Sequence, residues 1–305
     1  MMNRKLFYLF LLLLVTFFWG VTFPLIKESL AYISPLNFLF LRFLLSSVIM
    51  IPFLAGKREF LKRRTFTHGM IAGFLLFLGY YFQTVGLEYT TSSRSGIITG
   101  LYVVLIPLFS MLLLKKKPRP ADSGASVISF LGLVMMSLGS LGNSSIQLGD
   151  MLTIVCAAAY AIQIVYVSRF SKEIETWSFT FYQLFAVSIF SAVMIPFSGP
   201  YIMQFPPIVI FTLVFTAVFA GILAIYVSNR ALIHVEPSAA GVIFVGEPVF
   251  AVLASVMILN EGLSVYTIAG GSIMVVSMLI TAYDRIREER SLKSGDSSGR
   301  KQISP

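Results

Sequence analysis

The sequence has few charged residues for its length. Only 12% of its 305 residues are Asp, Glu, Lys or Arg, whereas an ordinary soluble domain has roughly 25%. A chain of this size folded in water would need more polar side chains to cover its surface. The composition therefore excludes an ordinary soluble globular protein.

Cysteine and histidine are almost absent, which limits the chemistry available to the chain. Cys156 is the one cysteine and lies in an apolar run, and His68 and His234 are isolated. One thiol forms no intrachain disulfide, and scattered residues of this kind build no zinc site. Phosphate-loop and metalloprotease motifs are also absent. We expect no metal, no cofactor and no nucleotide hydrolysis by this chain.

Apolar residues are abundant: they make up 57% of the chain, and the mean hydropathy is +0.85. A helix needs about 20 apolar residues to cross a bilayer. The sequence predicts an all-α integral membrane protein with ten transmembrane helices, near residues 6–26, 35–55, 68–88, 95–114, 124–142, 150–168, 178–197, 208–228, 239–259 and 264–283. The start resembles a signal peptide, but its apolar run continues past residue 18, so we interpret it as an uncleaved first helix.

The basic residues alternate with the spans. Twenty of the 23 lysines and arginines fall on one side of the predicted membrane, Lys27 and Arg94 fall on the other, and Arg42 lies within a span. An excess of Lys and Arg marks the cytoplasmic side. We therefore expect a multi-pass protein of the cytoplasmic membrane with both termini in the cytoplasm. The charge of +9 is explained by topology, so no nucleic-acid partner is expected.

The two halves of the chain are similar. Met50-Ile51-Pro52-Phe53 ends the second predicted span, and Met194-Ile195-Pro196-Phe197 ends the seventh, 144 residues later. We predict two five-helix repeats, residues 1–143 and 144–284, followed by a disordered cytoplasmic tail, 285–305. Because five is odd, the second repeat enters the membrane from the opposite side, as in many secondary transporters.

Four segments carry a family resemblance: FFWGVTFPLIK, LRFLL, TGLYVVLIPLFSMLLLKKKP and GEPVFAVLASVMILNEGLS. In their order and spacing they resemble the drug/metabolite transporter superfamily, EamA type, over about residues 5–283. The resemblance implies ten helices, two EamA repeats, and export or exchange of small metabolites. The chain differs from the family pattern after the fourth span, where Lys117 occupies the place of an acidic residue such as Glu261 after the ninth.

Two strongly ionisable residues lie well within predicted spans, Arg42 and Glu247. Charges in a membrane usually face a cavity or pair with each other. In the functional interpretation, Glu247 binds a substrate amine or a coupling proton, and Arg42 binds a carboxylate. The alternatives are a fixed ion pair, or capping of backbone carbonyls by Arg42.

Prolines within or near the ends of spans are candidate hinges or kinks, because each removes a backbone hydrogen bond. Pro107 and Pro248 lie inside the fourth and ninth spans, and Pro24 lies near the outer end of the first. Broken backbone in a membrane belongs beside protein or a wet cavity. We therefore expect the fourth and ninth spans to line the pathway, although a plain packing kink would leave the same pattern.

Polar and aromatic side chains supply further candidates for substrate binding, since a solute site combines an apolar wall with a few hydrogen-bonding groups. Tyrosine and tryptophan near span ends also form the interfacial belt, which is the alternative for each aromatic residue. The candidates are Trp19, Thr22, Tyr81, Gln83, Tyr102, Tyr160, Gln163 and Tyr166.

These features favour a secondary transporter of a small molecule, such as an amino acid or related amine, with the proton as a candidate coupling ion. A membrane-embedded enzyme would need clustered catalytic groups, and only scattered candidates exist. A non-transporting membrane scaffold is the other alternative. The partners expected are a small-molecule substrate and the lipid bilayer, and the sequence leaves the oligomeric state open.

Overall fold

The computed structural model describes residues 4–115, 117–141, 147–197 and 201–299, and the regular structure of these residues is helical. Ten segments within them are long and apolar enough to span a membrane. They confirm the ten predicted spans. They run Lys5–Ser29, Pro35–Leu54, Arg63–Glu88, Ser92–Leu114, Pro120–Leu138, Leu148–Phe170, Thr176–Phe197, Pro207–Ala231, Pro237–Leu259 and Val265–Asp284.

Three of these spans, the fourth, eighth and ninth, contain two α-helices each. The first half contains α1 (Arg4–Ser29), α2 (Pro35–Met50), α3 (Arg63–Glu88), α4 (Ser92–Thr99), α5 (Tyr102–Leu114) and α6 (Pro120–Leu141). The second contains α7 (Leu148–Phe170), α8 (Thr176–Met194), α9 (Pro207–Phe215), α10 (Ala224–Ala231), α11 (Pro237–Phe244), α12 (Gly246–Leu259) and α13 (Val265–Gly299). Several helices begin at a proline, whose fixed φ suits the first helical turn and whose missing N–H costs nothing there.

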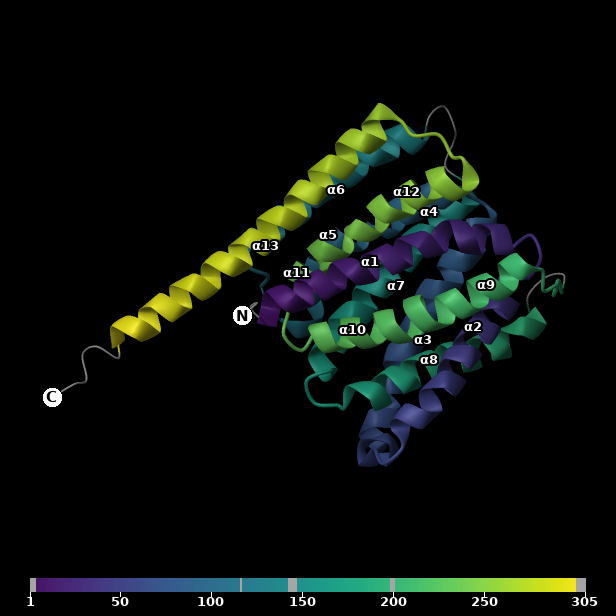
Figure 1. Cartoon of the computed structure of the whole chain (residues 1–305), viewed down its shortest axis with the longest axis horizontal. Helices are drawn as coiled ribbons and strands as arrows, with labels where there is room; N and C mark the ends of the chain where they lie inside the picture. The colour runs from purple at the N-terminus through teal and green to yellow at the C-terminus, as the bar shows by residue number, and fades with distance from the viewer. Residues whose placement is uncertain (1–3, 116, 142–146, 198–200, 300–305) are drawn as a thin grey trace.

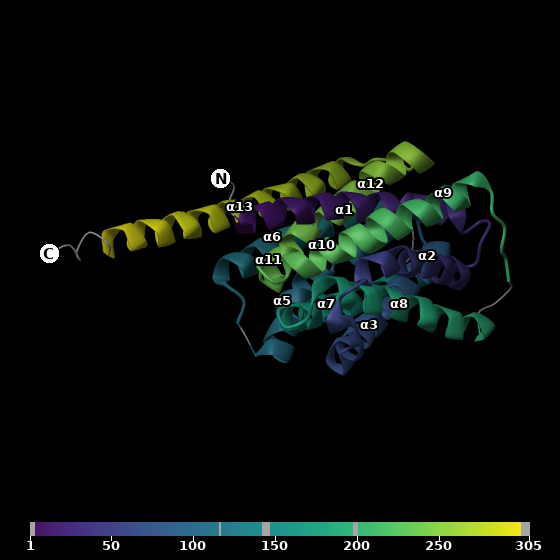
Figure 2. The same cartoon turned by 60° about the horizontal axis from the view of Figure 1, so that its bottom comes forward.

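Corresponding spans of the two halves meet each other across the bundle (Figures 1 and 2). The second span, α2, packs on the seventh, α8, and the fifth, α6, packs on the tenth, α13. The fourth and ninth spans cross, so that α4 contacts α12 and α5 contacts α11. This pairing follows a pseudo-two-fold relation. With five spans in each half, the repeats are inverted.

The matching MIPF segments occupy the same structural place in both halves. Helix α2 ends at Met50 and continues as a 3₁₀ turn, Ile51–Leu54, while α8 ends at Met194 and continues as the turn Ile195–Phe197. A proline ends an α-helix because it offers no N–H and crowds the preceding turn. The short sequence match therefore marks equivalent helix ends.

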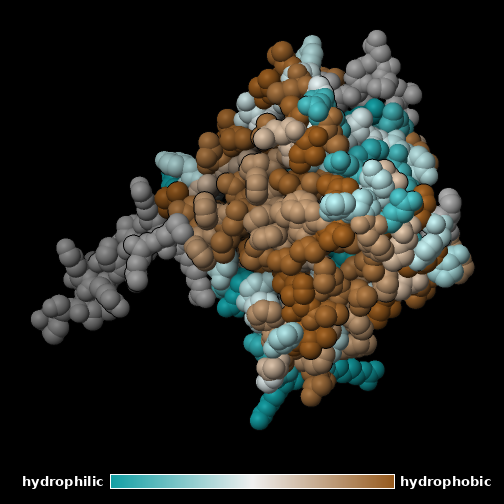
Figure 3. All heavy atoms as spheres, turned by 45° about the vertical axis from the view of Figure 1, so that its right-hand side comes forward, coloured by the Kyte–Doolittle hydropathy of each residue, from teal (hydrophilic) through white to brown (hydrophobic). Residues whose placement is uncertain are grey.

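The outer surface of the bundle is apolar. Large side chains such as Phe10, Leu112 and Leu279 are more than half exposed, and Figure 3 shows hydrophobic residues over most of the face in view, with hydrophilic residues gathered at its edges. An apolar surface this extensive is unfavourable in water. It fits the hydrocarbon core of a bilayer.

The last described part of the chain, after the tenth span, is drawn as a continuation of the final helix. Helix α13 continues to Gly299 and extends well beyond the bundle in both views (Figures 1 and 2). A helix with no tertiary packing is marginal in water. Disorder of residues 285–305 therefore stays a prediction, and residues 300–305 lie outside the described part of the chain.

A carboxylate caps helix α8 at the basic end of the molecule. Glu175 accepts hydrogen bonds from the backbone N–H groups of Trp177 (3.0 Å) and Ser178 (2.8 Å), and Lys57 lies 3.3 Å away. Although partial burial acts in the opposite direction, these hydrogen bonds and the Lys57 charge hold the pKa of Glu175 below its usual 4.5.

Replacing Glu175 with alanine is expected to lower stability by about 1 kcal/mol, the usual effect of losing an N-cap. Because the pKa of Glu175 is lower in the folded state, its contribution is complete above pH 4.5 and disappears as the pH falls through the folded-state value. Thermal unfolding of the detergent-purified variant at neutral and acidic pH measures this. Glu173→Ala is the control, since Glu173 makes only partly exposed ion pairs. An equal loss in both variants, at every pH, would contradict the capping role.

Candidate functional site

Two broken helices cross in the middle of the protein. The fourth span is interrupted between α4 and α5 at Gly100 and Leu101, and the ninth between α11 and α12 at Val245. The first half-helices, α4 and α11, are each eight residues long. The breaks therefore lie at equivalent points of the two repeats, and they place Tyr102 and Glu247, 145 positions apart, in the first turns of α5 and α12.

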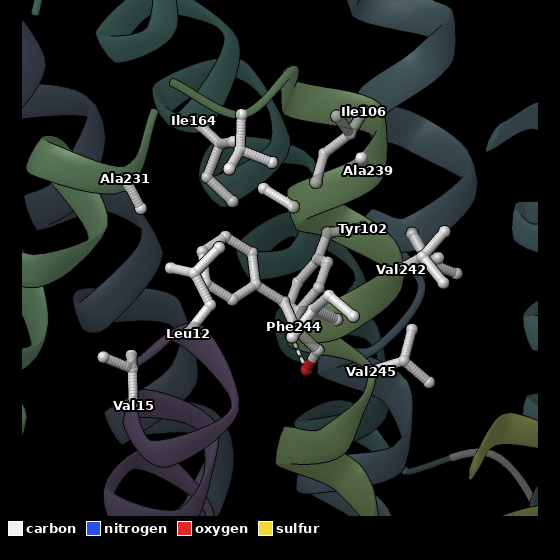
Figure 4. Packing of buried hydrophobic residues seen from close by; sticks show 14 of the residues in the cluster. Leu12, Val15, Tyr102, Ile106, Ile164, Ala231, Ala239, Val242, Phe244 and Val245 are labelled. Atoms are coloured by element: carbon white, nitrogen blue, oxygen red, sulfur yellow. Dashed lines mark hydrogen bonds between the residues drawn. The ribbon is translucent and has the colours of Figure 1, made fainter. Parts of the chain in front are cut away.

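These two residues bond to each other across the crossing point. The hydroxyl of Tyr102 lies 2.9 Å from Oε2 of Glu247 and 2.6 Å from the backbone oxygen of Phe244. Figure 4 shows the Tyr102 hydroxyl bonded to Phe244 within the surrounding apolar packing. In an unbroken helix the carbonyl of Phe244 would accept from the residue at position 248, but Pro248 has no N–H. Tyr102 supplies the missing donor.

Arg42, on α2, is almost fully buried, with 1% of its surface exposed. None of its guanidinium nitrogens makes a hydrogen bond of normal geometry to the described residues, and Tyr80 is the polar side chain that lies close enough to interact with it. The group lies over the rings of Phe43 and Tyr80, each 4.8 Å from the ring centre. Aromatic faces attract a cation, but they leave its N–H groups unsatisfied. Arg42 and Glu247 form no ion pair in this structure.

Arg42 and Glu247 nevertheless line one cavity. Its walls come from both repeats, and its volume is about 40 Å³, room for a few water molecules. A metabolite would need the helices to separate. The lining residues are Trp19, Thr22, Arg42, Leu76, Tyr80, Gln83, Tyr102, Tyr160, Gln163, Ile164, Val167, Ile225, Ser228, Asn229, Leu232, Phe244 and Glu247.

Most polar groups of the cavity wall are held by neighbours. Tyr160 donates to Gln83 (3.2 Å), and Gln163 donates to Gln183 (3.1 Å). Trp19 donates from Nε1 to the carbonyl of Ala220 (3.1 Å), which lies in the π-helical segment Thr216–Leu223 between α9 and α10. Thr22 bonds back to its own helix. The wall is thus largely preorganised, and the buried polar groups in it without such a hydrogen bond are the Arg42 guanidinium and the Ser228 hydroxyl.

Two predicted residues do not line this cavity. Tyr81 faces away and contacts Phe77 and Phe82, while its neighbour Tyr80 occupies the wall. Successive residues on a helix point about 100° apart, so a one-residue shift changes the face. Tyr166 lies in a separate hollow at the basic end and bonds to His68 (2.7 Å).

The predicted prolines act differently from one another. Pro248 follows the break in the ninth span, as described above. Pro107 lies inside α5 and Pro24 inside α1, and both helices continue through them. The break in the fourth span lies instead at Gly100 and Leu101.

The cavity-wall residues that the sequence analysis did not name include Tyr80, Asn229 and Phe244. Tyr80 could have been predicted from Gln83, because Leu76, Tyr80 and Gln83 follow helical spacing on one face. Asn229 is a polar residue within the eighth span and is a signal by itself. Phe244 enters through the helix break, for which the sequence carries no equally clear sign.

The two ends of the protein are different. At the end with the N-terminus, a hollow of about 940 Å³ is lined by cationic residues including Lys5, Lys117, Arg169 and Lys172. Leu232 lines both this hollow and the central cavity. We refer to this hollow as the basic vestibule.

The opposite end is bridged by polar contacts to α4. Glu261 accepts from the backbone N–H groups of Ser92 (3.0 Å) and Ser93 (3.1 Å). Arg94 pairs with Asp150, and both side chains are buried. The start of the fourth span is therefore tied to the sixth span and to the segment that follows the ninth.

Among the residues that the structure describes, no group of three or more His, Cys, Asp or Glu side chains is placed to hold a metal ion.

Comparisons with known proteins agree with this architecture. The EamA-like transporter family matches twice, at residues 6–138 and 147–283. An uncharacterized transporter of Archaeoglobus fulgidus is 34% identical over 271 residues, covering 89% of this chain and 84% of the relative. The uncharacterized transporter YvbV of Bacillus subtilis is 25% identical over 277 residues, covering 88% and 90%.

A solved structure superposes with a TM-score of 0.76 at 19% identity, covering 95% of this chain and all of the other, and it supports the fold. The family match extends over both halves of the chain, and the broken-helix cavity lies where the two halves meet. This membrane-spanning transporter belongs to the EamA-like transporter family.

Proposed function

We propose that the protein exports or exchanges a small metabolite, such as an amino acid or related amine, by alternating access coupled to protons. The observation that carries this proposal is the buried guanidinium of Arg42, which has no carboxylate partner, in a cavity that also holds Glu247. A buried, unpaired charge is costly to a fold. A solute carboxylate would satisfy it.

The chemistry of the cavity supports a solute with both an acidic and a basic group. Arg42 offers a planar set of N–H donors that matches a carboxylate. Glu247, when ionised, offers a counter-charge to an amine. Trp19, Tyr80 and Tyr160 provide an apolar wall for the remainder of the molecule. The proton and the amine then compete for one carboxyl group, which couples their movements in opposite directions.

The difference between the two ends supports alternating access. The basic vestibule lies at the end where both termini and most basic loops gather, which the positive-inside rule assigns to the cytoplasm. We infer that this conformation is closed outward by the contacts of Glu261 and Asp150, and that solute enters from the cytoplasmic side of the cell membrane.

A thermal-shift screen of the detergent-purified protein against amino acids, amines, nucleosides and sugar phosphates tests the solute class. A ligand at 100 times its Kd raises the apparent stability by about 2.7 kcal/mol. We expect shifts from amino acids or amines that are absent in Glu247→Gln. A shift from sugar phosphates alone, lost in Arg42→Lys and kept in Glu247→Gln, would contradict the proposal.

A further inference from the structure

We propose that Pro248 and Tyr102 are positioning residues that hold a proton on Glu247 in this conformation. The inference rests on the proposed function of Glu247 as the proton carrier, and it assigns the control of that proton to one break in the ninth span. The evidence is a count of the hydrogens available for hydrogen bonding among three neighbouring oxygens: the Tyr102 hydroxyl, the backbone oxygen of Phe244 and Oε2 of Glu247.

The hydroxyl of Tyr102 has one hydrogen and two close oxygen neighbours. The backbone oxygen of Phe244 is 2.6 Å away and Oε2 of Glu247 is 2.9 Å away. A carbonyl oxygen can only accept. Tyr102 therefore donates to Phe244 across the shorter distance, and its own oxygen is left to accept a hydrogen from Glu247. That hydrogen exists only if the Glu247 carboxyl is protonated.

Pro248 determines the direction in which the Tyr102 hydroxyl donates its hydrogen bond. If the ninth span were an unbroken helix, an ordinary residue at position 248 would offer its N–H to the carbonyl of Phe244, four residues earlier. Proline has none, so the carbonyl of Phe244 takes the hydrogen of Tyr102. With that hydrogen engaged, nothing donates to an ionised Glu247, and its neutral acid form is favoured.

The surroundings of Glu247 reinforce the same state. The ionisable groups that face it from the packed elements are Tyr102 on α5, Tyr80 on α3, and Cys156 and Tyr160 on α7. Each is neutral in its ordinary state at pH 7. Arg42 on α2 shares the cavity but makes no ion pair with Glu247. No adjacent cation therefore compensates an ionised Glu247.

The arrangement also couples the proton to the conformation. Tyr102 belongs to the first repeat, whereas Phe244, Glu247 and Pro248 belong to the second. The hydrogen bonds that join Phe244, Tyr102 and Glu247 exist only while α5 and α11 cross as they do here. When the repeats move relative to one another, Tyr102 leaves its two partners, and Glu247 becomes free to exchange its proton.

The experiment is an infrared pH titration of the full chain in lipid nanodiscs without solute, in which the probe is the proton itself. The carboxylic-acid C=O band that disappears in Glu247→Gln belongs to Glu247. We expect this band at neutral pH in the wild type. In Pro248→Ala the new N–H bonds to Phe244 and frees Tyr102 to donate to the carboxylate. The pH at which half of the band is lost should then fall by about one unit.

Two further variants make the result specific. In a Tyr102→Phe background, Pro248→Ala should cause no shift, because the hydroxyl that mediates it is gone. Pro107→Ala, a matched proline replacement in α5, should leave the midpoint unchanged. Tyr102→Phe alone should move the Glu247 band to higher frequency, as an acid loses its acceptor, and this readout remains if Pro248→Ala does not fold.

The proposal is overturned if the wild type has no protonated Glu247 band at neutral pH, or if the band is the same in Tyr102→Phe. It is also overturned if Pro248→Ala shifts the midpoint equally with phenylalanine at position 102. These results are independent of transport. A normal titration together with proton-insensitive transport would instead refute the proposed coupling and leave this inference intact.

Discussion

Replacing Glu247 with glutamine is expected to abolish solute accumulation driven by a pH gradient, while the protein still inserts and folds. Glutamine has nearly the same shape and can still hydrogen-bond to Tyr102, but it neither gains nor loses a proton. Accumulation in proteoliposomes should fall to background. Binding of an amine-bearing solute should weaken roughly 10- to 100-fold, since a hydrogen bond to a charged group contributes about 1.5–3 kcal/mol.

Glu88→Gln is the matched control for this experiment. Glu88 is the last residue of α3, is exposed, and does not line the cavity. The same chemical change there should leave accumulation at the wild-type level. Normal proton-driven accumulation by the Glu247 variant would remove Glu247 from the coupling mechanism, whatever solute is used.

The ten spans could be predicted from sequence because a bilayer imposes a length and a polarity on each segment. The distribution of basic residues added the alternation of sides, and the MIPF match marked equivalent helix ends. These signals are local along the chain. They do not depend on how side chains pack.

The positions of the helix breaks were harder to predict from the sequence. Pro107 and Pro248 are both prolines within spans, yet α5 continues through Pro107 and the fourth span breaks at Gly100 and Leu101. A proline removes one hydrogen bond, but tertiary contacts decide whether the helix kinks or stops. The π-helical turn at Thr216–Leu223 has a similar cause, because Trp19 and Ser46 bond to its carbonyls from other spans.

The same limit applies to the cavity residues, because tertiary packing decides which side chains line the cavity. Arg42 and Glu247 could be identified because charges within spans are rare. Tyr81 was chosen where Tyr80 lines the wall, since two adjacent tyrosines differ only in the direction that their helix gives them. That Tyr102 and Glu247 bond to each other depends on the crossing of the two repeats, which no local pattern encodes.

Replacing Arg42 with methionine is expected to stabilise the protein and to abolish solute binding. The Arg42 guanidinium is buried without a carboxylate partner, and exchanging buried ionic groups for apolar side chains of similar volume often stabilises a protein, by up to about 4 kcal/mol. The variant should unfold at a higher temperature than the wild type. An amino acid that shifts the wild type should give no shift, because the donor set for its carboxylate is gone.

Arg94→Met is the matched comparison, because Arg94 is equally buried but pairs with Asp150. Removing one partner of a buried pair leaves the other charge uncompensated and costs roughly 3–5 kcal/mol. The two arginine-to-methionine changes should therefore move the unfolding temperature in opposite directions. If Arg42→Met destabilises the protein as much as Arg94→Met, Arg42 contributes to the fold in the way that Arg94 does. The proposal that the Arg42 guanidinium binds a solute carboxylate would then be wrong.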